Sequence, residues 1–229
     1  MEWREIGDGV AVLQYPLRAF AIDFRRYVTL LRLTDGRLVI HSTAPFTQED
    51  VAAIRRFGKP CWLVEATLMH DTFARQARAA FPELPYLVPS DLEKISGVPI
   101  QALDPPPADW TGEIDVLKIE GLRKINEHAF FHRTSRTLVL ADLLFHFPSD
   151  ARGWPRFFAQ RVMRLPRLRG ISAFFRFMIR DQEAFASSMK TLLEWDFGQI
   201  VVGHGEPIQG DAKFIFTQAL RDRGLVQDG

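Results

Sequence analysis

The 229-residue sequence contains one cysteine, almost no net charge and no long apolar run. The single Cys61 excludes a disulfide framework and a thiol-rich metal site. With 29 Lys and Arg against 28 Asp and Glu, the formal charge is +1, so we expect no nucleic-acid partner for the chain as a whole. No apolar run approaches the roughly 18 residues of a membrane span, and the first ten residues do not form a secretion signal. These absences predict a soluble, cytoplasmic protein.

The apolar content of 47% is enough to bury a substantial core, and we expect one domain over residues 1–229. Periodicity and turn residues predict an alternation of strands and helices. The predicted strands cover 10–16, a hairpin over 27–42, 61–66, 85–90, 114–122, 128–133, 136–145 and 199–202, and the predicted helices cover 48–57, 71–81, 187–197 and 211–223. Strands in both halves, each half ending in helices, favour an α/β (α+β type) fold with two sheets packed face to face and helices outside.

Segment 152–180 differs from the rest because it holds eight arginines, six aromatic residues and no acidic residue. We expect a helical insertion at about 150–185, and two interpretations of it stay open. Its aromatic side chains could face the core while its arginines are solvated. Alternatively, the segment could contact an anionic partner, a membrane surface or another subunit.

Three polar residues follow buried strands at their carboxyl ends: His70, Asp142 and His204. In layered α/β folds, side chains from separate strands converge at that edge. Two imidazoles and one carboxylate suit a zinc site with an open position or a ferrous site. Each residue also has a structural interpretation: His70 could open a helix with Asp71 beside it, a cap or salt bridge could satisfy Asp142, and His204 could belong to a turn.

The order of these motifs resembles the metallo-β-lactamase superfamily, a four-layer αββα sandwich of metal-dependent hydrolases. The likeness runs from "GDGVAVLQYP" through "DGRLVIHS" to "GHGEPI" and the helix after it. More narrowly, "HDTFARQARAAFPE", "NEHAFFHRTSRTLVLADLLFHFP" and "VVGHGEPI" resemble an uncharacterised branch of the superfamily, a domain of unknown function. The resemblance implies that His70, Asp142 and His204 sit in the metal cleft.

The sequence also departs from the superfamily pattern. The hallmark His-x-His-x-Asp-His corresponds here to residues 65–70, where only the last histidine is kept, and the histidine expected before "DLLF" has no counterpart around 121–124. The resemblance therefore implies that a two-zinc site is not assembled. Glu65, Glu127 and His132 are candidate replacements. Glu127 and His132 are five residues apart, so strand alternation lets at most one of them face the cleft.

We therefore consider a hydrolase with one divalent metal, Zn or Fe, that cleaves an ester, amide or phosphoester of a small-molecule substrate. Asp71 or Glu127 would act as the catalytic proton acceptor. The alternative is a non-catalytic member of the fold, without a metal, whose cleft or arginine-rich segment binds a small ligand or a protein. A third possibility is that 152–180 contacts an anionic membrane surface or nucleic acid, and both contacts should weaken with salt.

Overall fold

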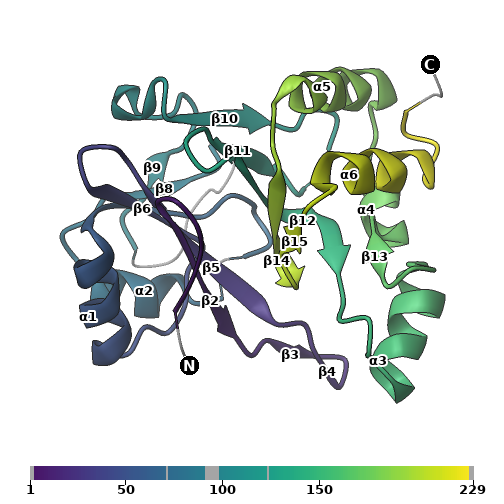
Figure 1. Ribbon diagram of the computed structural model, residues 1–229, viewed down its shortest axis with the longest axis horizontal. Coiled ribbons are helices and arrows are strands. Elements are labelled where there is room, and N and C mark those ends of the chain that lie inside the picture. Colours follow the sequence, from purple (N-terminus) through teal and green to yellow (C-terminus); the bar gives the residue numbers. More distant parts are fainter. Residues whose placement is uncertain (1–2, 71, 91–97, 123, 227–229) are drawn as a thin grey trace.

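The computed structural model describes residues 3–70, 72–90, 98–122 and 124–226, and Figure 1 shows their arrangement. The strands form one hydrogen-bonded network in the order β10-β11-β12-β14-β5-β6-β7-β8-β9. Its two halves are joined only where β14 meets β5, through the pair His204 and Arg26. The network therefore folds over at this point into two sheets that pack face to face.

The first sheet is built from the N-terminal half of the chain. Its strands are β1 (Arg4–Gly7), β2 (Val10–Tyr15), β5 (Arg26–Arg32), β6 (Arg37–His41), β7 (Lys59–Val64), β8 (Tyr86–Val88) and β9 (Gln101–Ala102). The helices α1 (Gln48–Phe57) and α2 (Ala74–Ala80) cover its outer face. A separate small hairpin, β3 (Arg18–Ala19) with β4 (Ile22–Asp23), projects between β2 and β5.

The second sheet comes from the C-terminal half. Its strands are β10 (Ile114–Lys118), β11 (His128–His132), β12 (Thr137–His146), β13 (Arg169–Gly170), β14 (Gln199–Gly205) and β15 (Ile208–Gln209). The helices that pack on it are α4 (Ala173–Met178), α5 (Gln182–Glu194) and α6 (Ala212–Arg221). A short helical turn at Ala108–Trp110 precedes β10.

Alternation along the central strands explains the layers. Val139 of β12 and Val201 of β14 point between the sheets, where they meet Val39 of β6 in one buried cluster. Their neighbours Leu140 and Val202 point outward and pack under α5 and α6. Both faces of these strands are buried, so successive apolar residues contribute to two different cores. The expected four-layer αββα sandwich is confirmed.

Two of the predicted helices begin at the wrong residue, and the strand predicted over 114–122 ends at Lys118. The helix expected at 187–197 begins at Gln182, because the Asp181 side chain accepts hydrogen bonds from the amides of Glu183 and Ala184 and caps it there. The helix expected from residue 71 begins at Ala74. Residue 71 itself lies outside the described residues.

Segment 152–180 is not one helix. It contains α3 (Gly153–Phe157), a π-helical turn at Phe158–Val162, the short strand β13 and then α4. Strand β13 pairs with the end of β12, which anchors the segment to the second sheet. Figure 1 shows α3 at the same end of the molecule as the β3–β4 hairpin. No helix of the described residues is long and apolar enough to cross a membrane.

Candidate metal centre and its cavity

The structure brings His70, Asp142 and His204 together, and we call these three residues the triad. The Nε2 atoms of the two histidines lie 3.1 Å apart. Asp142 Oδ1 lies 3.2 Å from Nε2 of His70 and 3.4 Å from Nε2 of His204. Among the described residues, the triad is the one group of three or more His, Cys, Asp or Glu side chains whose donor atoms converge in this way.

Strand pairing at the end of the second sheet creates this convergence. β12 and β14 run parallel, but their register shifts between Leu140 and Phe145, so the stretch of β12 that carries Asp142 bulges from the ladder. Asp142 therefore lies within β12, as the strand predicted over 136–145 implies, and not at the carboxyl end of a strand, where the sequence analysis also placed it. Gly203 permits the close approach, because a Cβ atom there would collide with the carbonyl of Ala141.

The distances between the donor atoms of the triad test whether a metal ion fits. Ligand atoms about 2.0–2.2 Å from a tetrahedral ion lie roughly 3.3–3.6 Å from one another. The triad's donor atoms are 3.1–3.4 Å apart. The other carboxylate oxygen, Asp142 Oδ2, is buried and has no hydrogen-bond partner among the described residues. Three converging donors with an unsatisfied oxygen beside them fit a cation better than a closed hydrogen-bond network.

The protonation states agree with this fit. Burial lowers the pKa of His70 to about 4, against the opposing effect of Asp142, so its imidazole is neutral at pH 7 and keeps a lone pair. Burial acts to raise the pKa of Asp142, but the two imidazoles outweigh it and the pKa lies below its usual range. Neutral imidazole and ionised carboxylate are the forms that bind metal.

The ring of His204 is oriented by aromatic packing. It stacks on Phe145, with ring centres 5.6 Å apart and planes at 12°, and meets the edge of Phe24 at 5.9 Å. Its Nδ1 atom is buried without a hydrogen-bond partner among the described residues. The ring is thus held by apolar neighbours while Nε2 faces the other two residues of the triad.

Glu127 lies behind the triad and is fully buried. Its two oxygens accept hydrogen bonds from the amides of Ala141, at 2.8 Å, and Asp142, at 3.0 Å. Burial, together with the nearby Asp142 carboxylate, raises the pKa of Glu127. This placement holds the β12 bulge that carries Asp142 and does not put Glu127 among the residues that line the cavity described below.

No protein-family model matches the chain, and no curated protein matches it by sequence. Solved structures do. A metallo-β-lactamase from Pontibacter korlensis has a TM-score of 0.63 at 13% identity, over 97% of this chain and 98% of its own. One from Erythrobacter litoralis has a TM-score of 0.63 at 13% identity, over 98% and 92%. The DIM-1 metallo-β-lactamase exposed to ceftazidime has a TM-score of 0.63 at 12% identity, over 96% of both chains. This chain has the metallo-β-lactamase fold. At such low identity the likeness concerns the fold and carries no activity with it.

Residue 65 occupies the position of the first histidine in the hallmark pattern, and here it is a buried glutamate with partners of its own. Glu65 pairs with Arg26 at 2.9 Å, and both side chains are 1% exposed. Ser42 and Thr43 also donate to Glu65, at 3.3 and 2.8 Å. We call these four residues the Arg26 cluster. Glu65 Oε1 also lies 3.7 Å from Nδ1 of His70, the ring nitrogen that does not face the triad, so Glu65 neighbours the triad without joining its donor atoms.

The Arg26 cluster was not foreseen from the sequence. Arg26 stands directly before the largely apolar stretch 27–31, and an arginine beside such a stretch is the signal that could have pointed to a buried pair. Its guanidinium also donates to the carbonyl of His70 at 3.0 Å, so the cluster supports the backbone of one triad residue.

The remaining sequence candidates lie elsewhere. His132 is at the far end of β11 from Glu127, where its Nε2 contacts the carbonyl of Arg32 at 3.0 Å and its Nδ1 contacts Ser135 Oγ at 2.7 Å. Neither Glu127 nor His132 lines the cavity. Asp71, proposed from the sequence as a proton acceptor, lies outside the described residues.

The triad forms the floor of a cavity of about 510 Å³. Its only other polar lining residue among those described is Ser172. The remaining lining residues are all apolar: Leu17, Ala19, Phe20, Phe24, Met69, Ile125, Phe145, Phe158, Val162, Met163, Phe174 and Phe175. Most of these walls come from the β3–β4 region and from segment 152–180. The sequence located the candidate ligands but did not predict that this segment encloses them.

Proposed function

We propose that this protein is a hydrolase that holds one divalent metal ion through His70 Nε2, Asp142 Oδ1 and His204 Nε2. The observation that supports it is the convergence of these three atoms, beside the unsatisfied Asp142 Oδ2, at the floor of a cavity. Two imidazole nitrogens and one carboxylate oxygen suit Zn²⁺ with an open position, or Fe²⁺. Such an ion supplies Lewis-acid chemistry and brings the pKa of water near neutrality.

Asp142 Oδ2 is buried and the pKa of this carboxyl lies below its usual range, so Asp142 would hold the ion and is not the base for the attacking water. We propose Asp71, which follows His70 in the sequence, as the acceptor of the proton that the attacking water loses. The water oxygen forms a bond to the carbonyl carbon or phosphorus of the substrate, the bond to the alcohol or amine breaks, and the proton passes to that leaving group. Glu127 keeps Asp142 in place through its backbone and takes no proton from the substrate.

The cavity favours a substrate with an apolar part. Its described lining contains no Lys or Arg that would bind an anionic group, and apart from the triad and Ser172 it is apolar. We therefore propose an ester, amide or phosphoester whose scissile bond lies over the triad while a hydrophobic group fills the space above it.

Elemental analysis tests the metal site directly. Protein purified without chelator, or dialysed against Zn²⁺ and Fe²⁺ salts, should carry one equivalent of metal. Asp142→Asn and His204→Ala should each weaken metal binding by roughly 100-fold or more, because two remaining donors do not hold a tetrahedral ion. His132→Gln is the matched control, since this histidine is equally buried but lies away from the triad, and it should retain the metal.

The competing function is a non-catalytic binding module. A wild-type protein that stays metal-free in both dialyses would contradict the hydrolase proposal and favour this module. If metal binds, cleavage of p-nitrophenyl esters of increasing chain length should be abolished by both triad variants and kept by His132→Gln.

A further inference from the structure

Most of the large apolar side chains that are exposed in the described residues lie in the segments that wall the cavity. Phe20, Met69, Val162 and Phe174 line it directly. Trp154 and Phe157 belong to α3, and Phe177 follows Phe174 by three residues on α4. We call these seven residues the apolar rim. Phe214 on α6 is the remaining large exposed apolar side chain of the described residues, and it does not line the cavity. Scattered exposed apolar residues are ordinary, but a contiguous set around an opening marks an interaction surface.

Contacts join the two sides of the rim. The indole nitrogen of Trp154 in α3 donates to the carbonyl of Phe20 at 2.9 Å. The ring of Phe20 stacks on Phe158 at 5.7 Å, and Trp154 stacks on Phe157 at 5.6 Å. The hairpin tip and segment 152–180 therefore present one continuous edge.

The tip of the hairpin is held in an unfavourable backbone conformation. Phe20 and Ala21 have φ values of 52° and 59°, a left-handed region that bulky residues rarely adopt. Phe20 is also 73% exposed, so burial of its ring in this chain does not compensate for the strain. Two positive φ values are what the two-residue turn between the paired residues Ala19 and Ile22 requires, so the hairpin holds the Phe20 ring exposed at its tip.

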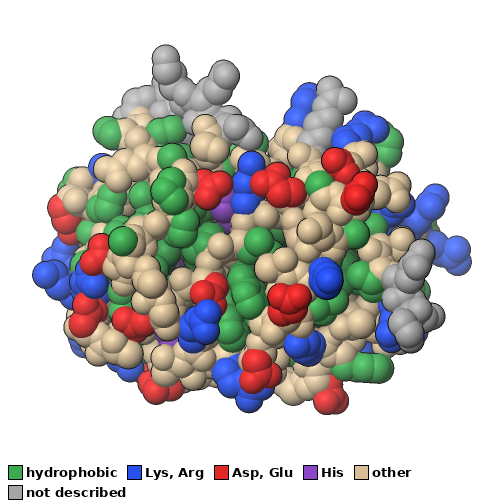
Figure 2. Space-filling view, turned by 90° about the horizontal axis from the view of Figure 1, so that it is seen from above, with side chains coloured by type: hydrophobic (Ala, Val, Ile, Leu, Met, Phe, Trp, Pro, Cys, Tyr) green, Lys and Arg blue, Asp and Glu red, His purple; other side chains and the backbone are tan. Residues whose placement is uncertain are grey.

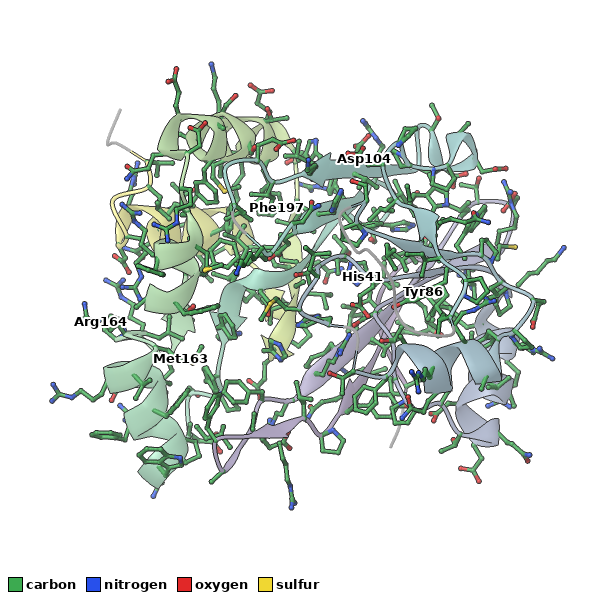
Figure 3. All side chains as sticks on the ribbon, turned by 180° about the vertical axis from the view of Figure 1, so that it is seen from behind. His41, Tyr86, Asp104, Met163, Arg164 and Phe197 are labelled. Carbon is green, nitrogen blue, oxygen red and sulfur yellow. The ribbon has the colours of Figure 1, made fainter. Side chains whose placement is uncertain are left out.

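The charge around the rim is positive. Of the eight arginines in segment 152–180, only Arg167 forms an ion pair within the described part of the chain, with Asp222. Arg156, Arg161 and Arg164 are exposed next to the rim residues. Figure 3 shows Arg164 at the outer edge of the molecule, whereas its neighbour Met163 lines the cavity. By contrast, Figure 2 shows acidic and basic side chains interspersed on the face over α5 and β10.

We propose that the apolar rim and these arginines dock on an anionic lipid bilayer, and that the cavity receives the hydrocarbon chain of a lipid from it. Exposed aromatic and aliphatic side chains enter the interface while arginines meet anionic headgroups, the combination typical of peripheral membrane binding. A nucleic acid would also meet the arginines, but it offers nothing to the aliphatic part of the rim. Membrane docking does not depend on the proposed hydrolase function. The interpretation that docking delivers a substrate rests on that function.

Vesicle co-sedimentation tests the docking. Full-length protein should bind phosphatidylcholine vesicles that contain about one quarter phosphatidylserine at least roughly tenfold better than pure phosphatidylcholine vesicles, and binding should fall as salt increases. The double variant Phe20→Ser/Trp154→Ser should lose at least tenfold of this affinity. Phe214→Ser, an equally exposed phenylalanine elsewhere, should bind like wild type.

A second pair of variants tests the charge. Arg156→Glu should weaken binding severalfold, and Arg56→Glu, which is equally exposed but on α1, should not. A failure of wild type to prefer anionic vesicles would overturn the docking. Equal loss in the Phe214 or Arg56 controls would do the same. So would binding to duplex DNA that is as tight as vesicle binding and insensitive to Phe20→Ser/Trp154→Ser.

A lipid with a photoactivatable group at the end of its acyl chain tests the cavity. Cross-links mapped by mass spectrometry should reach Phe24 or Met163, and cross-links confined to the rim would overturn chain entry. Wild-type protein stripped of metal with a chelator separates this inference from the proposed function, because it should bind vesicles like the metal-loaded protein. Metal binding without vesicle binding would defeat only the docking, and vesicle binding by a protein that takes up no metal would defeat only the hydrolase.

Discussion

Two groups of buried polar residues lie side by side at the same end of the sandwich, and they differ in how completely they are satisfied. In the Arg26 cluster, the Glu65 carboxylate receives donors from Arg26, Ser42 and Thr43. In the triad, three donor atoms face one another, and Asp142 Oδ2 has no partner within the described residues.

The difference separates a structural role from a functional one. A buried ion pair with all its hydrogen bonds made has nothing left to offer a ligand. A buried carboxylate with a free oxygen costs stability unless something completes it, so its presence at the floor of a cavity indicates a site for binding. The degree of satisfaction distinguishes the two groups more clearly than residue type, since both contain buried charge.

Breaking the Arg26 cluster should give the largest effect on stability. Arg26→Met leaves Glu65 buried without its partner and should lower the free energy of unfolding by about 3–5 kcal/mol. Urea denaturation monitored by circular dichroism measures it. The double variant Arg26→Met/Glu65→Leu removes both charges and should recover most of the loss. No recovery would mean that the cluster contributes more than the pairing of its charges.

A change at Glu127, which does not contact the metal site directly, should still lower the metal affinity of the triad. Glu127→Gln turns one of the two acceptors of the Ala141 and Asp142 amides into a donor, so the β12 bulge shifts and metal affinity should fall roughly 10–100-fold. Competition with a chromophoric chelator measures this affinity. Glu194→Gln changes an exposed glutamate at the end of α5 and serves as the control. Unchanged affinity in Glu127→Gln would show that the bulge does not need this carboxylate.

Buried His41 should make the free energy of unfolding depend on pH. Burial lowers the pKa of His41 to about 3 from its ordinary value of 6.5. The unfolded chain therefore binds a proton that the folded chain does not, and stability falls as the pH drops below 6.5. For this one group the loss between about pH 7 and pH 5 is about 2 kcal/mol. In metal-free protein, His41→Leu should reduce the pH dependence of the unfolding free energy by that amount, and an unchanged slope would show that His41 is not responsible.

Several features of the fold follow from local pattern. Alternating apolar residues in 10–16 and 27–42 and the turn at 34–36 predict strands that the structure contains. The capping box of α1, in which Thr47 and Asp50 exchange hydrogen bonds, sits where the sequence predicts a helix start. Predicted helix boundaries are wrong where one capping side chain sets the first residue, as Asp181 does for α5.

By itself, the sequence determined the layers of the sandwich and the three residues that end up as the triad, because apolar periodicity and the position of polar residues beside buried strands are local properties of the chain. Only the tertiary structure decided that His70 meets Asp142 and His204 across 72 and 134 positions of sequence. The tertiary structure also decided that Glu65 forms an ion pair with Arg26 and that segment 152–180 lines a cavity. These outcomes depend on distances of a few ångströms between distant segments, which are set by strand register and a bulge that no local pattern encodes.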